Sequence, residues 1–257
     1  NHDLNLDAAD PSFAFESWKR VIGPAHYAFQ YSGATFIVLN NVEYLDRDDV
    51  PSDGRRYRGR IGAQQLSFVD NVLRHVPGHH LIVVSMHIPL LNYEAPESSS
   101  DTTADRRALL ELLSHRPHTV SFAGHSHTTE HHYFGREDGF DRDQPHHHHI
   151  LTAACGSWWS GPVDGLGIPI SDSRDGSPKG FHRLSVDQNR YETCFVPFPG
   201  DTAKQMRILL QNIEQPERAI NGPVAVSALN TVRLLVNAFD GGPQTKVTVE
   251  VAGRLLN

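Results

Sequence analysis

Three short motifs in the sequence carry residues that can bind metals or move protons. They are Asn1-His2-Asp3, a single His87, and Gly124-His125-Ser126-His127. The second and third motifs follow short apolar runs that are typical of buried strands. Imidazole nitrogens and amide oxygens are suitable ligands for Zn, Fe or Mn, and two histidines at positions i and i+2 of a tight turn can face neighbouring metals. The spacing therefore predicts a metal site assembled from separate segments.

The elements that must position these motifs alternate between strand and helix. Compact apolar runs at residues 35–39, 81–84 and 119–123 predict buried strands, while residues 64–76 and 104–113 have the apolar spacing of helices. This order predicts a parallel sheet with helices on its faces. Since ligands gather outside the carboxyl ends of the strands in such sheets, we expect the three motifs to converge at one edge.

The pattern changes after about residue 128. Short strand-like segments follow, and beyond about residue 200 only strands are expected. We therefore predict an α/β fold in which residues 1–198 form the core and residues 199–257 form a β-rich C-terminal domain. The expected strands of this second half lie at residues 131–134, 150–154, 181–186, 191–196, 206–210, 231–237 and 246–251.

Composition excludes several classes of protein. The chain is 39% hydrophobic and 21% charged, which is ordinary for a globular protein and rules out a disordered or coiled-coil chain. No apolar run reaches the roughly 18 residues that span a bilayer. A net charge of −7 without a basic cluster argues against nucleic-acid binding through a positive face. The 17 histidines indicate metal or proton chemistry without locating it. Cys155 and Cys194 could pair or remain thiols, and both possibilities stay open.

Taken in order, the three motifs resemble the calcineurin-like metallophosphoesterase superfamily. The signature of that family runs D-x-H, G-D-x-x-D, G-N-H-D/E, a single His, and then G-H-x-H. Further segments are similar to a bacterial subgroup that carries an appended C-terminal domain, so the resemblance covers nearly the whole chain. These segments are residues 58–66, 146–150, 156–162, 175–181 and 205–208.

The resemblance implies a layered phosphoesterase core and a role for each motif residue. Asn1, His87 and His125 match three ligands of the second of two metals, and His127 matches a ligand of the first. His2 matches a histidine beside the leaving group, a candidate general acid, and Asp3 matches the acidic residue that orients it. The implied reaction is hydrolysis of phosphoric esters by a metal-bound hydroxide, with two divalent ions (Mn, Fe or Zn) and a small or macromolecular phosphoester as substrate.

The chain also departs from the family pattern. Neither D-x-H nor G-D-x-x-D occurs, and Gly200-Asp201 lacks the second acid. The bridging carboxylate and two ligands of the first metal are therefore absent, and a neutral site should bind a divalent ion weakly. We expect a fragment of a longer enzyme with an incomplete dimetal site, exposed apolar sheet edges and little activity as an isolated chain. We favour a periplasmic or secreted location over a cytoplasmic one.

Other functions are also compatible with the sequence, and several residues are expected to have structural roles only. One alternative is a non-catalytic, phosphoesterase-like scaffold that recognises carbohydrate or a cell-surface ligand, and another is an enzyme of the acid phosphatase type. The run His146–His149 is expected to form mainly a solvated face, although one of its members could reach the active site. We expect His79-His80 and His131-His132 at the surface and Trp158-Trp159 as a core or domain-interface anchor. We also expect a surface loop over residues 46–60, of which residues 46–49 are solvated.

Overall fold

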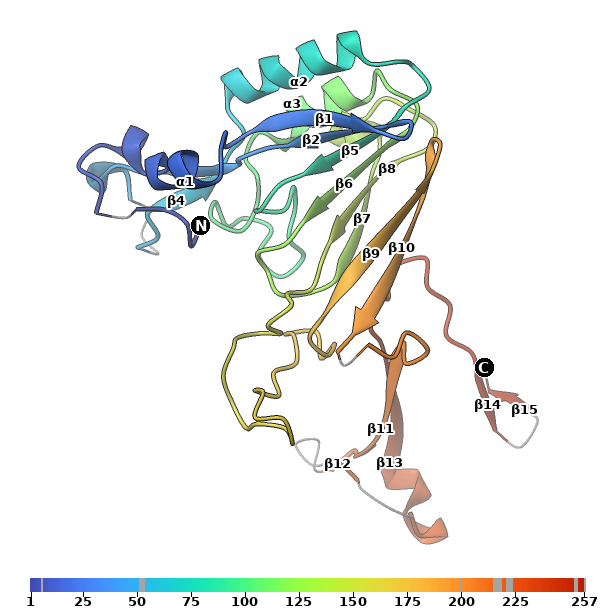
Figure 1. Cartoon of the computed structure of the whole chain (residues 1–257). Helices are drawn as coiled ribbons and strands as arrows, with labels where there is room; N and C mark the ends of the chain where they lie inside the picture. The colour runs from blue at the N-terminus through green and yellow to red at the C-terminus, as the bar shows by residue number, and fades with distance from the viewer. Residues whose placement is uncertain are drawn as a thin grey trace.

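A six-stranded mixed sheet forms the centre of the computed structural model, which describes residues 1–5, 7–50, 54–198, 200–214, 219–220, 224–251 and 254–256. The strand order is β1-β2-β5-β6-β8-β7 (Figure 1). The four inner strands run parallel, and the edge strands β1 and β7 pair antiparallel. The bounds are β1 Tyr27–Tyr31, β2 Ala34–Val38, β5 Leu81–Ser85, β6 Thr119–Ala123, β7 Glu130–Phe134 and β8 His146–Ile150.

Helices cover one face of this sheet. Helices α2 (Ala63–His75) and α3 (Arg106–Leu113) lie side by side over it (Figure 1). Their buried residues Val69 and Leu110 belong to the same apolar cluster as Ile37 of β2 and Val84 of β5. This cluster is the main core, and it fixes the strands whose carboxyl ends carry the histidine motifs.

An antiparallel hairpin packs against the opposite face. Strands β9 (Gly180–Asp187) and β10 (Arg190–Pro197) supply Leu184 and Tyr191, which pack against Val83 and Phe122 of the sheet. The sequences of the middle strands are therefore nearly continuous apolar runs, because both faces of these strands are covered. The edge strand β1 differs, since its aromatic residues Tyr27 and Phe29 remain exposed.

The remaining elements are short. The structure contains a helix α1 (Glu16–Val21) and a two-stranded sheet of β3 (Val42–Tyr44) and β4 (Tyr57–Gly59). Beyond residue 200 the described elements are a three-stranded sheet, a second pair of strands and one 3-10 helix. They are β11 Met206–Asn212, β12 Ala219–Ile220, β13 Val232–Ala238, β14 Val249–Val251, β15 Arg254–Leu256 and η4 Val226–Thr231; the other 3-10 helices are η1 Pro11–Phe13, η2 Arg47–Asp49 and η3 Arg136–Asp138.

The predicted fold class is confirmed, with corrections to individual elements. The α/β core and the β-rich C-terminal part are both present, whereas the domain boundary at residue 199 stays a prediction. The strand expected at residues 150–154 was placed too late, because β8 consists of the histidines and ends at Ile150. Strands β1 and β3 were not predicted, and the loop expected around residues 46–60 contains β4; residues 51–53 of that loop lie outside the described residues.

Two further findings concern the chain as a whole. In the part of the chain that the structure describes, no helix has both the length and the apolar character needed to cross a membrane. Cys155 and Cys194 are both free thiols, which settles the alternative that the sequence left open.

Candidate metal site

Two turns at the carboxyl ends of neighbouring parallel strands carry the candidate ligands. His87 lies just beyond β5, and the amide of Gly124, just beyond β6, donates to the His87 carbonyl at 3.1 Å. The buried Asn41 fixes the first turn, because its Oδ1 accepts hydrogen bonds from the amides of both His87 and Ile88, each at 3.1 Å. The backbone of both turns is thus held independently of the side chains of His87 and His125.

The Gly124–His127 turn has an unusual backbone. His125 has φ 71° and His127 has φ 58°, so both adopt the left-handed conformation that costs a residue with a side chain about 1–2 kcal/mol. The intervening Ser126 is buried and its hydroxyl lies 2.7 Å from that of Thr128, which supports the turn. Strained histidines of this kind cluster at functional sites, where the surrounding structure holds them in place.

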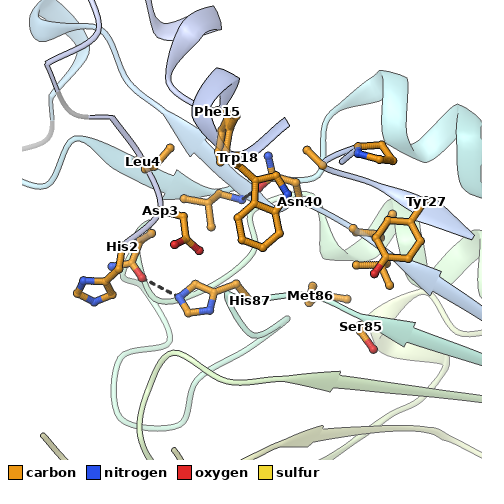
Figure 2. A pocket seen from close by; sticks show the side chains of 16 residues that line it. His2, Asp3, Leu4, Phe15, Trp18, Tyr27, Asn40, Ser85, Met86 and His87 are labelled. Atoms are coloured by element: carbon orange, nitrogen blue, oxygen red, sulfur yellow. Dashed lines mark hydrogen bonds between the residues drawn. The ribbon is translucent and has the colours of Figure 1, made fainter. Parts of the chain in front are cut away.

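Three of the predicted ligand residues meet at one point. Asn1 Oδ1 lies 2.7 Å from His87 Nε2 (Figure 2), and His125 Nδ1 lies 3.2 Å from the same Nε2 atom. The Nδ2 group of Asn1 donates to the Tyr57 hydroxyl at 3.1 Å, which leaves Oδ1 directed at the histidines. Burial is the largest of the causes that lower the pKa of His87 to about 3, so its imidazole is neutral at pH 7.

Asp101 holds the far side of this cluster, and sequence reasoning missed it. Its Oδ1 lies 3.2 Å from His125 Nε2, and Arg55 donates to the same carboxylate at 2.7 and 2.9 Å. The hydrogen bond from His125, followed by those from Ser98 and Arg55, holds the pKa of Asp101 well below its usual range in spite of partial burial. A carboxylate on the second ring nitrogen fixes the tautomer so that Nδ1 keeps a lone pair for the cluster.

His127 lies apart from the other three residues. Its Nδ1 donates to the Ser157 carbonyl at 2.6 Å, which leaves Nε2 with a free lone pair, and its ring stacks near Trp158 at 6.0 Å between centroids. Within the described residues, no direct hydrogen bond joins His127 to Asn1, His87 or His125. A backbone carbonyl on one ring nitrogen is nonetheless the usual support for a histidine that binds a metal through the other.

His2 and Asp3 line a pocket of about 370 Å³ together with His87. His2 and His87 lie at one end of this pocket and Tyr27 at the other (Figure 2). The His2 ring is 5.8 Å from that of Trp158. The resemblance implied that Asp3 orients His2, but in the described part of the chain no hydrogen bond joins the two, and both side chains are exposed.

Trp158 and Trp159 were expected to anchor a core or a domain interface. They do not anchor a core, because each is 58% exposed, and Trp158 stands beside His2 and His127.

The surface positions expected for the histidines of β7 and β8 are wrong. The histidines of β7 and β8 do not lie on a solvated face. The hairpin β9–β10 covers one side of these strands, and loop residues including Leu90 and Phe140 cover the other side. His131, His132, His146, His148 and His149 are all buried.

The fold and this site define an α/β protein with a histidine-rich candidate metal site at the carboxyl edge of its sheet. Residues 148–256 match the family model described as the C terminal of Calcineurin-like phosphoesterase. This match confirms the resemblance to the calcineurin-like metallophosphoesterase superfamily from a region that lies beyond the metal-site motifs.

One solved structure is also similar in part. It is a dimetal phosphatase from Danio rerio, 16% identical in sequence, with a TM-score of 0.34 over 49% of this chain and 48% of that chain. The chain thus spans about half the length of that protein. No curated protein matches the chain.

Proposed function

We propose that this protein contributes Asn1, His87, His125 and His127 to a divalent-metal centre that hydrolyses phosphoric ester bonds. The observation that carries the proposal is the meeting of Asn1 Oδ1, His87 Nε2 and His125 Nδ1 at separations of 2.7 and 3.2 Å, from positions 86 and 38 residues apart. The family match at residues 148–256 supports phosphoester hydrolysis in general.

The donor set fits a Zn²⁺, Mn²⁺ or Fe ion. The single ring N–H that His87 Nε2 can carry cannot satisfy both Asn1 Oδ1 and the lone pair of His125 Nδ1, so one contact would remain between two acceptors. A cation placed among three lone pairs removes this conflict. The neutral imidazole of His87 is the form that binds metals, because a ligand must be deprotonated.

The surrounding residues would orient the ligands, protonate the leaving group and contact the substrate. A divalent ion held by these residues would lower the pKa of a bound water and stabilise the charge of the phosphoryl group. Asp101 orients His125, and the Ser157 carbonyl orients His127 toward a neighbouring ion. His2, which lines the pocket together with His87, would protonate the leaving group, and Trp158, whose ring lies 5.8 Å from that of His2, would contact an apolar part of the substrate.

The site formed by these residues lacks a bridging carboxylate of the family pattern. Asp101 binds the outer nitrogen of His125 and so cannot at the same time lie between two ions on the inner side. Two dications held by neutral ligands would repel each other without compensation. We therefore propose that these 257 residues alone bind metal weakly and turn over phosphoesters slowly.

The test is an assay of the chain with an aryl phosphate monoester and a diester, in the presence of Mn²⁺ or Zn²⁺. We expect slow, metal-dependent turnover that His125→Ala abolishes and that the control His79→Ala, a change at an exposed histidine, leaves intact. Turnover that survives both His87→Ala and His125→Ala would refute the site. Absence of turnover, together with calorimetry that detects no Mn²⁺ or Zn²⁺ binding removable by His125→Ala, would favour the non-catalytic, ligand-binding alternative.

A further inference from the structure

A second group of histidines surrounds the carboxylate of Asp240. Asp240 Oδ1 lies 3.2 Å from His131 Nε2, 3.0 Å from His149 Nε2 and 3.2 Å from His182 Nε2. The side chains are 11%, 0% and 3% exposed for the three histidines and 19% for Asp240. None of these four residues belongs to the Asn1–His87–His125 cluster.

Strand geometry delivers these histidines to one face. His131 of β7 and His149 of β8 are direct partners in the antiparallel ladder, so their side chains project to the same side of the sheet. That side faces the hairpin β9–β10, from which His182 approaches with its ring 4.9 Å from that of His149. Asp240 arrives from the segment after β13 and closes the group.

The backbone after β13 fits closely against this group. A Cβ atom on Gly242 would lie 2.7 to 2.9 Å from three atoms of His131, so only glycine allows this approach. The ring of Phe239 packs edge-on against Phe195 of β10 at 6.1 Å. The position of Asp240 is therefore fixed by its neighbours on both sides in the sequence.

The spacing of the donor atoms suits a metal. Ligand bonds of 2.0–2.1 Å in tetrahedral geometry place the ligand atoms about 3.3 Å apart, which is close to the separations around Asp240 Oδ1. One donor atom each from His149, His182 and Asp240 lies within 4.8 Å of the others, and the same holds for His131, His147 and His149. Two imidazoles and a carboxylate form a recurrent site for Zn²⁺ and other divalent transition metals.

Hydrogen bonds alone satisfy this group poorly, because the single oxygen Asp240 Oδ1 would have to accept N–H groups from His131, His149 and His182 at once. A cation bound between the carboxylate and the Nε2 atoms would replace these shared contacts, and each histidine would then carry its proton on Nδ1. In the part of the chain that the structure describes, Nδ1 of His149 and of His182 is buried without a partner, so each would need a bound water.

A relay of hydrogen bonds supports His131. Its Nδ1 lies 2.9 Å from His147 Nε2, and His147 Nδ1 lies 2.6 Å from the Tyr191 hydroxyl. Outer hydrogen bonds of this type fix the tautomer of a metal-binding histidine.

We propose that His149, His182 and Asp240, with His131 beside them, bind one Zn²⁺-type divalent ion that fastens the segment after β13 to the central sheet. The ion is structural, because its ligands come from three separate elements and lie beneath the hairpin β9–β10. This site is independent of the proposed phosphoesterase centre and would persist if that centre were refuted.

The test uses the full chain carrying His87→Ala and His125→Ala, so that the first cluster cannot contribute. After dialysis against EDTA, this variant is titrated with Co²⁺ and Zn²⁺. We expect one equivalent of Co²⁺ to produce the visible absorption of a tetrahedral site, displaced by Zn²⁺, and one equivalent of Zn²⁺ to raise the melting temperature. Adding Asp240→Asn or His182→Ala should weaken binding by at least about 100-fold.

The matched control is His146→Gln, which changes an equally buried histidine on the opposite face of β8 and should keep the equimolar binding. Should Asp240→Asn fail to fold, X-ray absorption of the Zn²⁺-loaded parent variant still tests the ligand set, which must contain at least two imidazoles and a carboxylate. Failure to bind one equivalent, or binding that Asp240→Asn and His182→Ala leave unchanged, would overturn the proposal.

Discussion

His87 Nε2 and His125 Nδ1 lie 3.2 Å apart, although 38 residues separate the two histidines in sequence. Each residue follows a parallel strand, and β5 and β6 are neighbours in the sheet, so the fold rather than any local contact brings them together. The turn that carries His125 needs a left-handed residue, whereas the turn that carries His87 does not. Position 125 therefore has a backbone requirement in addition to its proposed role as a ligand, whereas position 87 has only the role as a ligand.

Substitutions at these two histidines should affect stability in opposite ways. His125→Gly should be about 1 kcal/mol more stable than His125→Ala, because alanine pays for the positive φ and glycine does not. At His87, where φ is not positive, the alanine variant should be the more stable of the pair. Denaturant unfolding of all four variants measures this, and equal stabilities at position 125 would contradict the strained turn.

Asp101→Asn should weaken metal binding by about 10–100-fold, because the carboxylate would no longer fix the tautomer and raise the basicity of His125. Calorimetry with Zn²⁺ on chains that also carry His182→Ala, which weakens the second proposed metal site, measures the change. Asp70→Asn, which removes only an exposed ion pair with Arg74, is the control. An affinity that Asp101→Asn leaves untouched would show that Asp101 has no positioning role.

The carboxylate of Asp101 should also make the free energy of unfolding depend on pH. Its pKa is depressed in the folded protein, so its contribution is fully present above the unfolded pKa of about 3.9 and is lost as pH falls through the lower folded value. The parent should therefore exceed Asp101→Asn in unfolding free energy at pH 6, with the gap closing in strong acid. A gap that widens on acidification would contradict the direction of the shift.

The buried histidines of β8 should make the protein sensitive to mild acid. Burial, followed by the charge of His147, lowers the pKa of His146 to about 3, so the folded state excludes a proton that the unfolded state accepts below about pH 6.5. Stability is then full above pH 6.5 and falls as pH drops toward 3, by up to about 1.4 kcal/mol per pH unit for this residue. His146→Gln should flatten the slope measured by denaturant unfolding between pH 6.5 and 4.5, and an unchanged slope would refute the assignment.

Trp158 and Trp159 form a natural pair for testing contact with substrate, because both are 58% exposed. Trp158→Ala should raise the KM for an aryl phosphate several-fold, since only Trp158 lies beside His2 and His127. Trp159 instead lies under the ammonium group of Lys179, so Trp159→Ala should leave the KM unchanged. Equal effects of the two substitutions would remove Trp158 from the site, and melting temperatures check that both variants fold.

Apolar runs and strand order predicted the core well, because the strands at residues 34–38, 81–85 and 119–123 are buried on both faces. The exposed edge strand β1 was not predicted. Its aromatic residues alternate with small or polar ones, and its strand conformation depends on pairing with β2. No sequence pattern near Asp101 indicated its role, because its partner His125 lies 24 residues away in the chain. The histidines of β7 and β8 were assigned to the surface because polarity suggests exposure, whereas β9 and β10, some 30 residues further on, bury them.

The run of four histidines in β8 has a consequence for folding. Neighbouring residues of a strand face opposite sides, so sliding β8 by one residue along β7 would ordinarily exchange its two faces. Here a slide in one direction would still present histidine at both positions on the face toward β9 and β10, because His146 and His148 would replace His147 and His149. The histidines therefore cannot select the correct alignment. Apolar neighbours must do so, namely the fully buried Ile150 and the Phe134 that pairs with His146, and weakening either should populate a shifted sheet that keeps its histidines but loses its packing.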